Sequence, residues 1–389
     1  MADGSSVDLS EVGAWARTWL FDHALPLWWE AGADHVGGGF FEKLDQRGNP
    51  VGTPTRVRVQ ARQLYVFAEA GRLGWQGPWR AAVEHALAFM LERYSRPDGL
   101  FRSTLDAADE RVDLYDQAFV LFALAHAYDA YGQDAQLLMI ARRLLARLDE
   151  WLAHPLAGYE EANPRRLPLR SNPQMHLLES FFAWMQVGVN EPFSERALAL
   201  IELAESRLID PATGAIGEYF DGDWKFAQGA EGLIREPGHQ FEWAYLLQLS
   251  KTLLGHDARS TSVALEAFGS RYGVDSVRKL AIFAVDHAGK VIDGKARLWA
   301  QTERLRTSVA LAAVTDGAER ERLQQAVIAS METVRRFLDT PKRGLWWEWM
   351  DENDSFRQEP SPASSLYHLV TGLALLIRND GALQGEQPL

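Results

Sequence analysis

The chain repeats one structural unit along its length, and this repeat constrains its fold more than any other feature. Apolar residues recur at i, i+3, i+4 and i+7 in about a dozen windows, which is the spacing of an amphipathic helix. These windows lie near residues 11–31, 56–72, 78–94, 114–131, 134–152, 173–188, 194–208, 239–255, 258–272, 299–314, 320–338 and 363–378.

Every second helix is followed by a glycine-led turn and a short β-like segment. The six segments are GGFFEKLD near 37–45, DGLFRSTLD at 98–106, AGYEEA at 157–162, TGAIGEYFD at 213–221, GVDSVRKLAIFAVD at 273–286 and RGLWWEWMD at 343–351. The unit of helix, hairpin arm and helix recurs at roughly 60-residue spacing, and stacked units of this kind bury one continuous core. The sequence therefore predicts an all-α protein, a single (α/α)6 barrel of about twelve helices with short β-hairpins on one rim.

The faces of the helices support a double ring. The windows at 114–131 and 363–378 are apolar nearly all round, as an inner ring requires, whereas those at 134–152 and 320–338 carry a charged face suited to an outer ring. No Gly/Ser/Pro linker divides the chain. We expect residues 1–389 to form one domain, with flexible tails at 1–10 and 380–389.

Composition narrows the compartment and the partners. The 389 residues include no cysteine, which excludes disulfides, thiolate metal sites and a cysteine nucleophile and suits a cytoplasmic protein. A formal charge of -13 without a Lys/Arg-rich block argues against nucleic acid and anionic membrane as partners, and no apolar run is long enough to span a bilayer. The 14 Trp favour a neutral sugar, because indole faces stack on the C–H faces of pyranoses.

Polar or ionisable residues open each of the six apolar helices. These residues are Arg62, Tyr115, Asp116, Asn172, His176, His239, Glu242, Trp299, Glu303 and His368. In a barrel the six helix starts converge on one mouth, so we predict that this set lines a pocket.

Each residue also has a purely structural interpretation. A single His at a helix start is often a satisfied core or capping residue, and Asn172 before Pro173 resembles an N-cap with Pro at N1. Arg62 could pair with Asp116 or Glu303 in a buried network. Recurrence at the same relative position in six helices is what favours the pocket.

The chemistry of the set suits proton transfer next to a sugar carbonyl. Imidazole titrates near pH 6.5, so two histidines can donate and accept protons near neutrality. A base removes the proton from C2 of an open-chain aldose, and Arg62 stabilises the enediolate. Return of the proton to C1 gives the ketose, and return to the opposite face of C2 gives the epimer.

Three other classes remain open on the residues alone. An inverting glycosidase would use two of Asp116, Glu242 and Glu303 as its carboxyl pair. Three neutral histidines with a carboxylate would suit Zn or Mn, although no HExxH or H-x-H spacing occurs. A non-catalytic sugar-binding toroid is the third.

Seven motifs, in order over residues 15–378, resemble the N-acylglucosamine 2-epimerase superfamily, which includes cellobiose 2-epimerases, mannose 2-epimerases and bacterial mannose and sulfoquinovose isomerases. The motifs are GGFFEKLD, RVRVQARQLYVFAEAG, DLYDQAFVLFALA, NPQMHLLES, EPGHQFEWAYLL, LWAQTERL and SSLYHLV. The segment VQARQLYVF and the compact length look closest to the mannose isomerase and mannose 2-epimerase branch.

This resemblance implies metal-free proton transfer in an (α/α)6 barrel. It implies that His239 and His368 are the acid/base pair, with His368 at C1/C2, and that Arg62 holds the oxygens at C1 and C2. It assigns substrate binding to His176, Asn172, Tyr115, Glu242, Trp299 and Glu303.

We therefore expect a cytoplasmic isomerase of free aldoses that needs no cofactor and most directly converts D-mannose to D-fructose. A 2-epimerase of N-acylglucosamine, mannose or cellobiose is the alternative. No Gly-rich loop or basic cluster indicates a phosphorylated substrate; Arg165, Arg166 and Arg170 are an exception that a solvated loop explains. A homodimer and a nucleotide effector are both left open.

Overall fold

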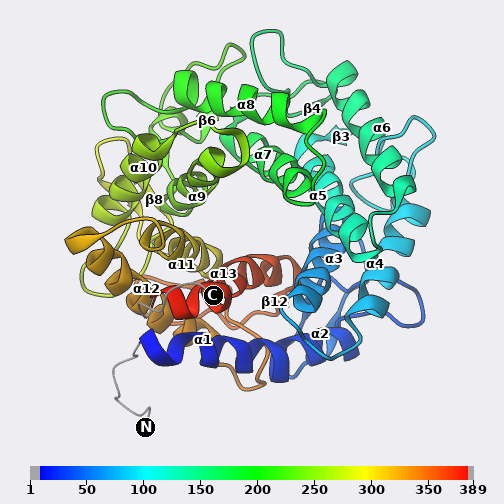
Figure 1. The fold of residues 1–389 in the computed structure, drawn as a ribbon, viewed down its shortest axis with the longest axis horizontal. Coiled ribbons are helices and arrows are strands. Elements are labelled where there is room, and N and C mark those ends of the chain that lie inside the picture. The colour runs from blue at the N-terminus through cyan, green and yellow to red at the C-terminus, as the bar shows by residue number, and fades with distance from the viewer. Residues whose placement is uncertain (1–8, 384–389) are drawn as a thin grey trace.

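A computed structural model describes residues 9–383 and shows two concentric rings of helices (Figure 1). The described helices are α1 (Leu9–Thr18), which continues through the π-helical turn η1 (Trp19–Ala24) into α2 (Leu25–Glu30), α3 (Val57–Arg72), α4 (Trp79–Tyr94), α5 (Leu114–Ala130), α6 (Ala135–Trp151), α7 (Ser171–Gln186), α8 (Phe193–Leu203, extended by η2, Ala204–Leu208), α9 (Pro237–Leu254), α10 (Arg259–Tyr272), α11 (Leu298–Ala312), α12 (Gly317–Leu338) and α13 (Leu366–Leu383). Short 3-10 turns lie at η3 (Glu231–Leu233) and η4 (Ala363–Ser365).

The inner ring is closed and consists of α3, α5, α7, α9, α11 and α13, each packed against the next, with α13 packed against α3. Each outer helix covers the inner helix that precedes it, and α1 covers α13. The N-terminal and C-terminal helices therefore lie side by side, as Figure 1 shows in blue and red. The predicted (α/α)6 toroid and its twelve helical windows are confirmed.

Short antiparallel strands join neighbouring units at one end of the ring. They are β1 (Lys43–Leu44), β2 (Pro50–Val51), β3 (Val112–Asp113), β4 (Ala162–Asn163), β5 (Leu169–Arg170), β6 (Tyr219–Phe220), β7 (Ile234–Arg235), β8 (Ala284–Asp286), β9 (Val291–Asp293), β10 (Ala296–Arg297), β11 (Trp349–Met350) and β12 (Ser361–Pro362). A strand that precedes an inner helix pairs with the arm of the following unit, as in β3–β4, β5–β6, β7–β8 and β10–β11. The pair β12–β1 closes the ring, with Lys43 opposite Pro362.

A buried glutamine near the start of five inner helices grips the arm of its own unit. Its amide oxygen accepts from one backbone N–H and its NH2 donates to the C=O of the same residue, so both groups of an irregular segment are satisfied. The five pairs are Gln60–Phe40, Gln117–Phe101, Gln174–Tyr159, Gln240–Ile216 and Gln301–Ala281. In the sixth unit the Ser361 hydroxyl makes both bonds to Trp346.

Each gripped arm needs a residue in the left-handed region just before the grip. In the last arm this is Gly344, whose φ is +91°, a conformation that glycine adopts without a steric penalty. The fifth arm uses Lys279 at φ 61° instead, so this arm has no glycine at the equivalent position.

One detail of the sequence prediction changes. Residues 9–10 and 380–383, assigned above to flexible tails, are helical, because α1 begins at Leu9 and α13 ends at Leu383; the remaining tail residues lie outside the described range. Among residues 9–383, no helix combines the length and apolar character needed to cross a bilayer.

The glutamine grip makes a stability prediction. Gln117→Met keeps the volume of the side chain but leaves the N–H and C=O of Phe101 unpaired, which we expect to lower the free energy of unfolding by about 1–3 kcal/mol. Urea denaturation followed by circular dichroism measures the change. The matched control Gln325→Met, on the exposed face of α12, should stay within about 0.5 kcal/mol of wild type; equal losses in both variants would refute the role of the grip.

Candidate functional site

The gripping glutamines put the predicted residues into register. Two residues after each glutamine, and at the matching place in α13, stand Arg62, Phe119, His176, Glu242, Glu303 and His368. Two residues before stand Arg58, Tyr115, Asn172, Gly238, Trp299 and, in the last unit, Ser364. Positions four apart share a helix face, so both sets project toward the ring axis.

These layers enclose a cavity of about 230 Å³ at the end of the barrel that carries the arms. Its lining is Arg62, Tyr115, Arg170, Asn172, His176, Glu218, Tyr219, Glu236, His239, Glu242, Phe283, Arg297, Trp299, Ser364, Ser365 and His368. Eight of the ten residues singled out in the sequence are in this set; Asp116 and Glu303 are not.

Asp116 was predicted to line the pocket, but its side chain does not reach the cavity. Its side chain is fully buried and pairs with Arg58, with 2.7 Å between Nε and Oδ1. Burial raises the pKa of Asp116 to about 6 despite that guanidinium. The ion pair with Arg58 holds the Asp116 side chain away from the cavity, whereas His239, which also directly precedes its gripping glutamine, lines it.

Glu303 lies behind His368 rather than in the cavity wall. Its Oε1 is 2.7 Å from His368 Nδ1, which leaves Nε2 as the ring nitrogen for a substrate. Burial, Arg62 and His176 hold the pKa of His368 well below its usual value. Burial raises the pKa of Glu303 to about 7. His368 is thus a neutral imidazole with the carboxyl group of Glu303 at its back, the arrangement of an oriented base.

His239 has the opposite electrostatic setting. Its Nδ1 lies 2.7 Å from Glu218 Oε2 and 3.7 Å from Glu236 Oε2. Burial alone would lower the pKa of His239, but Glu218 and Glu236 outweigh it and raise this pKa to about 10. His239 is therefore a cation at neutral pH.

The two histidines flank one indole. The Trp299 ring lies 4.9 Å from the His239 ring and 5.7 Å from the His368 ring, centroid to centroid. Because α11 separates α9 from α13, the two histidines are two helices apart in the ring and do not lie on opposite walls. The ring order instead sets Arg62 of α3 across from His239, and His176 of α7 across from His368.

Arg62 makes neither of the ion pairs considered for it. Its Nη2 donates to the Tyr115 hydroxyl at 2.6 Å and its Nη1 to the carbonyl of Ser364 at 3.2 Å. No acidic side chain among residues 9–383 forms an ion pair with Arg62. A guanidinium held by neutral groups at the cavity wall keeps its charge available for an oxyanion.

His176 and Glu242 complete the wall. His176 Nδ1 is 3.2 Å from Glu179 Oε2, and burial lowers the pKa of His176. Both oxygens of Glu242 are buried without a hydrogen-bond partner among the described residues. Burial, with Glu303 and Glu179 nearby, raises the pKa of Glu242 well above its usual value, so this carboxyl is neutral in the free protein.

Asn172 is not the N-cap that its position before Pro173 suggested. The helix α7 begins at Ser171 and its N-cap is Arg170. The Oδ1 of Asn172 has no partner among residues 9–383, and the side chain lines the cavity. An amide without partners at a cavity wall is available for a ligand hydroxyl.

Sequence reasoning missed the acidic residues that the arms contribute. Glu218 lies two residues after the gripped Ile216, and Glu42, Glu161 and Glu348 occupy the same place in three other arms. The recurrent Glu in FFE, YEE, IGE and WWE was the available signal. Its partners vary, because Glu161 holds Arg170 at 2.7 Å and Glu348 holds Arg297 at 2.6 Å.

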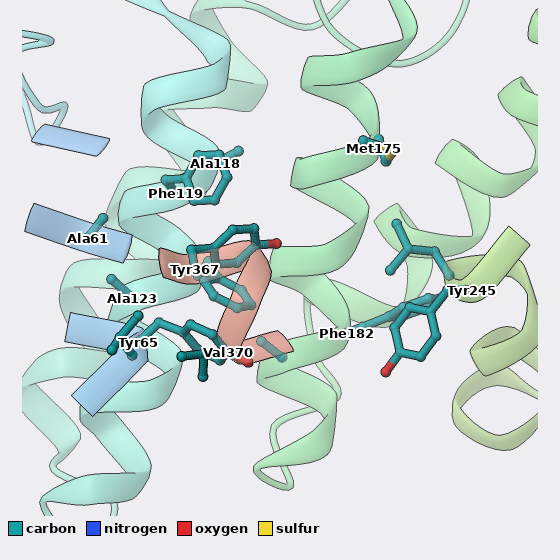
Figure 2. Close-up of a cluster of buried hydrophobic side chains, with 14 of the residues drawn as sticks. Ala61, Tyr65, Ala118, Phe119, Ala123, Met175, Phe182, Tyr245, Tyr367 and Val370 are labelled. Carbon is teal, nitrogen blue, oxygen red and sulfur yellow. The ribbon is translucent and has the colours of Figure 1, made fainter. Parts of the chain in front are cut away.

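Aromatic side chains fill the barrel beneath the cavity. Tyr367 of α13 lies 5.4 Å from Phe119 and 5.5 Å from Tyr65, centroid to centroid, and Figure 2 shows this group with Val370 in the space that the inner helices enclose. The site is therefore a closed-bottomed cup rather than a channel.

The described residues do not assemble a three-histidine metal site. Three groups could hold an ion, namely His176 with Glu179 and Glu242, His239 with Glu218 and Glu236, and His368 with Glu242 and Glu303. Each has one histidine, so the three-histidine set considered in the sequence does not converge. A cationic His239 is also a poor ligand.

The carboxylate pair of a glycosidase is also poorly supported. Of Asp116, Glu242 and Glu303, only Glu242 lines the cavity. An inverting pair must face the scissile bond from both sides, and this geometry leaves two of the three candidates engaged elsewhere.

Known proteins are similar to most of the chain or to a large part of it. A Rhizobium meliloti (strain 1021) protein named mannose-6-phosphate isomerase is 41% identical over 364 residues, which cover 91% of this chain and 94% of that protein. A Thermobifida fusca protein named D-mannose isomerase is 29% identical over 252 residues, 59% of this chain and 61% of that protein. The solved structure of a cellobiose 2-epimerase from Spirochaeta thermophila superposes with a TM-score of 0.85 at 19% identity, covering 97% of this chain and 98% of that one.

The class follows from these findings: the chain is an enzyme, a sugar isomerase or epimerase. Residues 39–372 match the family model of N-acylglucosamine 2-epimerase (GlcNAc 2-epimerase), and the chain belongs to that family.

The contrast between the two histidines predicts the pH dependence. Removing the carboxylate of Glu218 in Glu218→Gln takes away the largest of the interactions that raise the pKa of His239, so this pKa falls from about 10. The alkaline limb of kcat/KM, where the cation is lost, should move to lower pH, while the acid limb set by protonation of His368 stays in place. Histidine NMR titration and the kcat/KM profile measure both limbs, and Glu231→Gln on the exposed turn η3 is the control. An alkaline limb that does not move would contradict the assignment.

Proposed function

We propose that this protein isomerises free D-mannose to D-fructose by moving a proton between C2 and C1 of the open-chain sugar. One observation carries the proposal: a neutral His368 and a cationic His239 flank the indole face of Trp299 beside the guanidinium of Arg62. Groups whose environments push their pKa values apart are the expected acid and base.

His368 is the base in this scheme. Its Nε2 takes the proton from C2 of the aldehyde form, the C2–H electrons form the C1–C2 double bond, and O1 gains the negative charge. Arg62 stabilises that charge. The proton on His368 then returns to C1 while the proton of the O2 hydroxyl passes to O1, so the ketose differs from the aldose only by two relocated hydrogens.

His239 serves the step before isomerisation. As a cation it donates a proton to the ring oxygen of the pyranose. The bond between C1 and the ring oxygen breaks as the anomeric hydroxyl gives its proton to water, from which His239 regains the proton that it donated. His239 stands three residues before Glu242 in α9, roughly 4.5 Å nearer the mouth along the helix axis. Because His368 occupies the position equivalent to Glu242, His239 acts on the sugar ring nearer the mouth, and His368 acts on the C–H bond deeper in the cup.

The size and charge of the cavity favour a free monosaccharide. Its volume of about 230 Å³ is below the ~300–1,000 Å³ of pockets that hold drug-sized ligands. Of its three guanidinium groups, Arg170 and Arg297 already pair with Glu161 and Glu348. A phosphate would have to displace these carboxylates, so we propose mannose rather than the phosphorylated sugar in the name of the 41% identical relative.

The compartment and assembly are part of the same proposal. The absence of cysteine and the charge of -13 suit a cytoplasmic enzyme that binds no nucleic acid. A homodimer is compatible with a site that one chain completes by itself.

A proton NMR time course of D-mannose in D2O tests the proposal. We expect fructose as the first product, at the same rate after chelator treatment. Glucose as the main early product, with deuterium at C2, would instead identify a 2-epimerase. Parallel samples hold mannose 6-phosphate, N-acetylmannosamine and cellobiose, and a higher kcat/KM on any of these would overturn the choice of free mannose.

Alanine variants test the acid and base. His368→Ala and His239→Ala should each lower kcat by about 10²–10⁴-fold, the usual contribution of a general acid or base, with wild-type circular dichroism. His256→Ala, at a half-buried histidine outside the cavity lining, is the control. Near-wild-type turnover in either site variant would remove that histidine from the mechanism.

A further inference from the structure

The layer directly beneath the site contains an uncommon pair of buried charges. Five residues after the gripping glutamines, and three after His368 in α13, this layer holds Tyr65, Phe122, Glu179, Tyr245, Arg306 and Thr371. Arg306 is its only cation, and its side chain is 8% exposed. A buried guanidinium is costly unless its donors are satisfied.

Arg306 contacts the partners of both neutral histidines. Its Nη2 donates to Glu179 Oε1 at 2.9 Å and its Nη1 to Glu303 Oε2 at 3.4 Å. The helix between these carboxylates supplies Tyr245, whose ring lies under the guanidinium at 3.9 Å. One cation therefore bridges α7 and α11 across α9.

The second oxygen of each carboxylate contacts a histidine of the cavity wall. Glu303 Oε1 meets His368 Nδ1 at 2.7 Å, and Glu179 Oε2 meets His176 Nδ1 at 3.2 Å. Glu179 also accepts from the Tyr367 hydroxyl. Arg306 is thus one side chain removed from two imidazoles that face each other across the cup.

We infer that Arg306 is a positioning residue, which orients His368 and His176 from below through Glu303 and Glu179; the inference rests on the proposed role of His368. Removing a partner of two buried carboxylates would leave them free to take up protons and to change geometry, and the imidazoles they hold would follow.

The charges around His368 support a specific readout. The groups that face it are Arg62 from α3, His176 and Glu179 from α7, Glu242 from α9, and Glu303 and Arg306 from α11. After burial, Arg62, His176 and Arg306 lower the pKa of His368, whereas Glu179 raises it. The charged groups with the greatest effect on the pKa of His239 are Glu218, Glu236 and Glu242. A change at Arg306 should therefore act mainly on the acid limb of the kcat/KM profile, which His368 sets.

The test compares Arg306→Met, Arg306→Lys and the matched control Arg304→Met. Arg304 is also buried on α11, but it donates to the backbone carbonyl of Lys279 and not to Glu179 or Glu303. Histidine NMR titration of the substrate-free protein is combined with kcat/KM against pH and with Tm.

In Arg306→Met we expect the His368–Glu303 pair to take up its proton at higher pH, the acid limb to move with it, and kcat to fall about 10–100-fold. Arg306→Lys keeps the charge and should restore the acid limb while kcat stays reduced, because an ammonium lacks the fork that bridges two carboxylates. Arg304→Met should lower Tm and leave both limbs in place.

A fall in Tm with unchanged histidine titration in Arg306→Met would overturn the inference, and so would an equal acid-limb shift in Arg304→Met. If Arg306→Met does not fold, Arg306→Lys decides, and wild-type kcat in it would refute the role. The titrations need no turnover, so they still test Arg306 if mannose and the other sugars prove not to be substrates.

Discussion

The glutamine grip on the hairpin arms is the interaction on which the rest of this structure depends. An arm with only two or three residues of strand cannot satisfy its own backbone, and an unpaired buried N–H or C=O destabilises the fold. A side-chain amide offers one acceptor and two donors in one plane, which matches a single residue of extended backbone. Five inner helices use this match, and Ser361 replaces it in the sixth.

The same grip sets the register of the active layers. Once the glutamine is pinned to an arm, the residues two before and two after it must face the axis at defined heights. The inner helices can then differ freely in chemistry at those places, with Arg62, His176, Glu303 and His368 at equivalent positions. The fold supplies six equivalent positions, and the different side chains at these positions give the site its chemistry.

Electrostatic setting then separates residues of one chemical type. His239 and His368 are both buried at helix starts, yet two glutamates face the first, whereas Arg62 and His176 are the main charged neighbours that shift the second. One imidazole is therefore held charged and the other neutral. The burial of Glu179 and Glu303 behind the two neutral histidines is tolerable because Arg306 is a second partner of both.

The sequence by itself determined the toroid, because helical periodicity and a repeated arm leave few other ways to bury six apolar helices. It also determined most of the cavity wall, since recurrence at one relative position marks the inner face. It could not exclude Asp116, whose neighbour Tyr115 points inward while its own side chain turns to Arg58. Nor could it show that Glu303 lies behind His368, or that Glu218 and Arg306 belong to the network. The contacts of Glu218 with His239, Glu303 with His368 and Arg306 with Glu179 join residues 21 to 127 positions apart. Only the closure of the ring decides which side chains of different repeats come within hydrogen-bond distance.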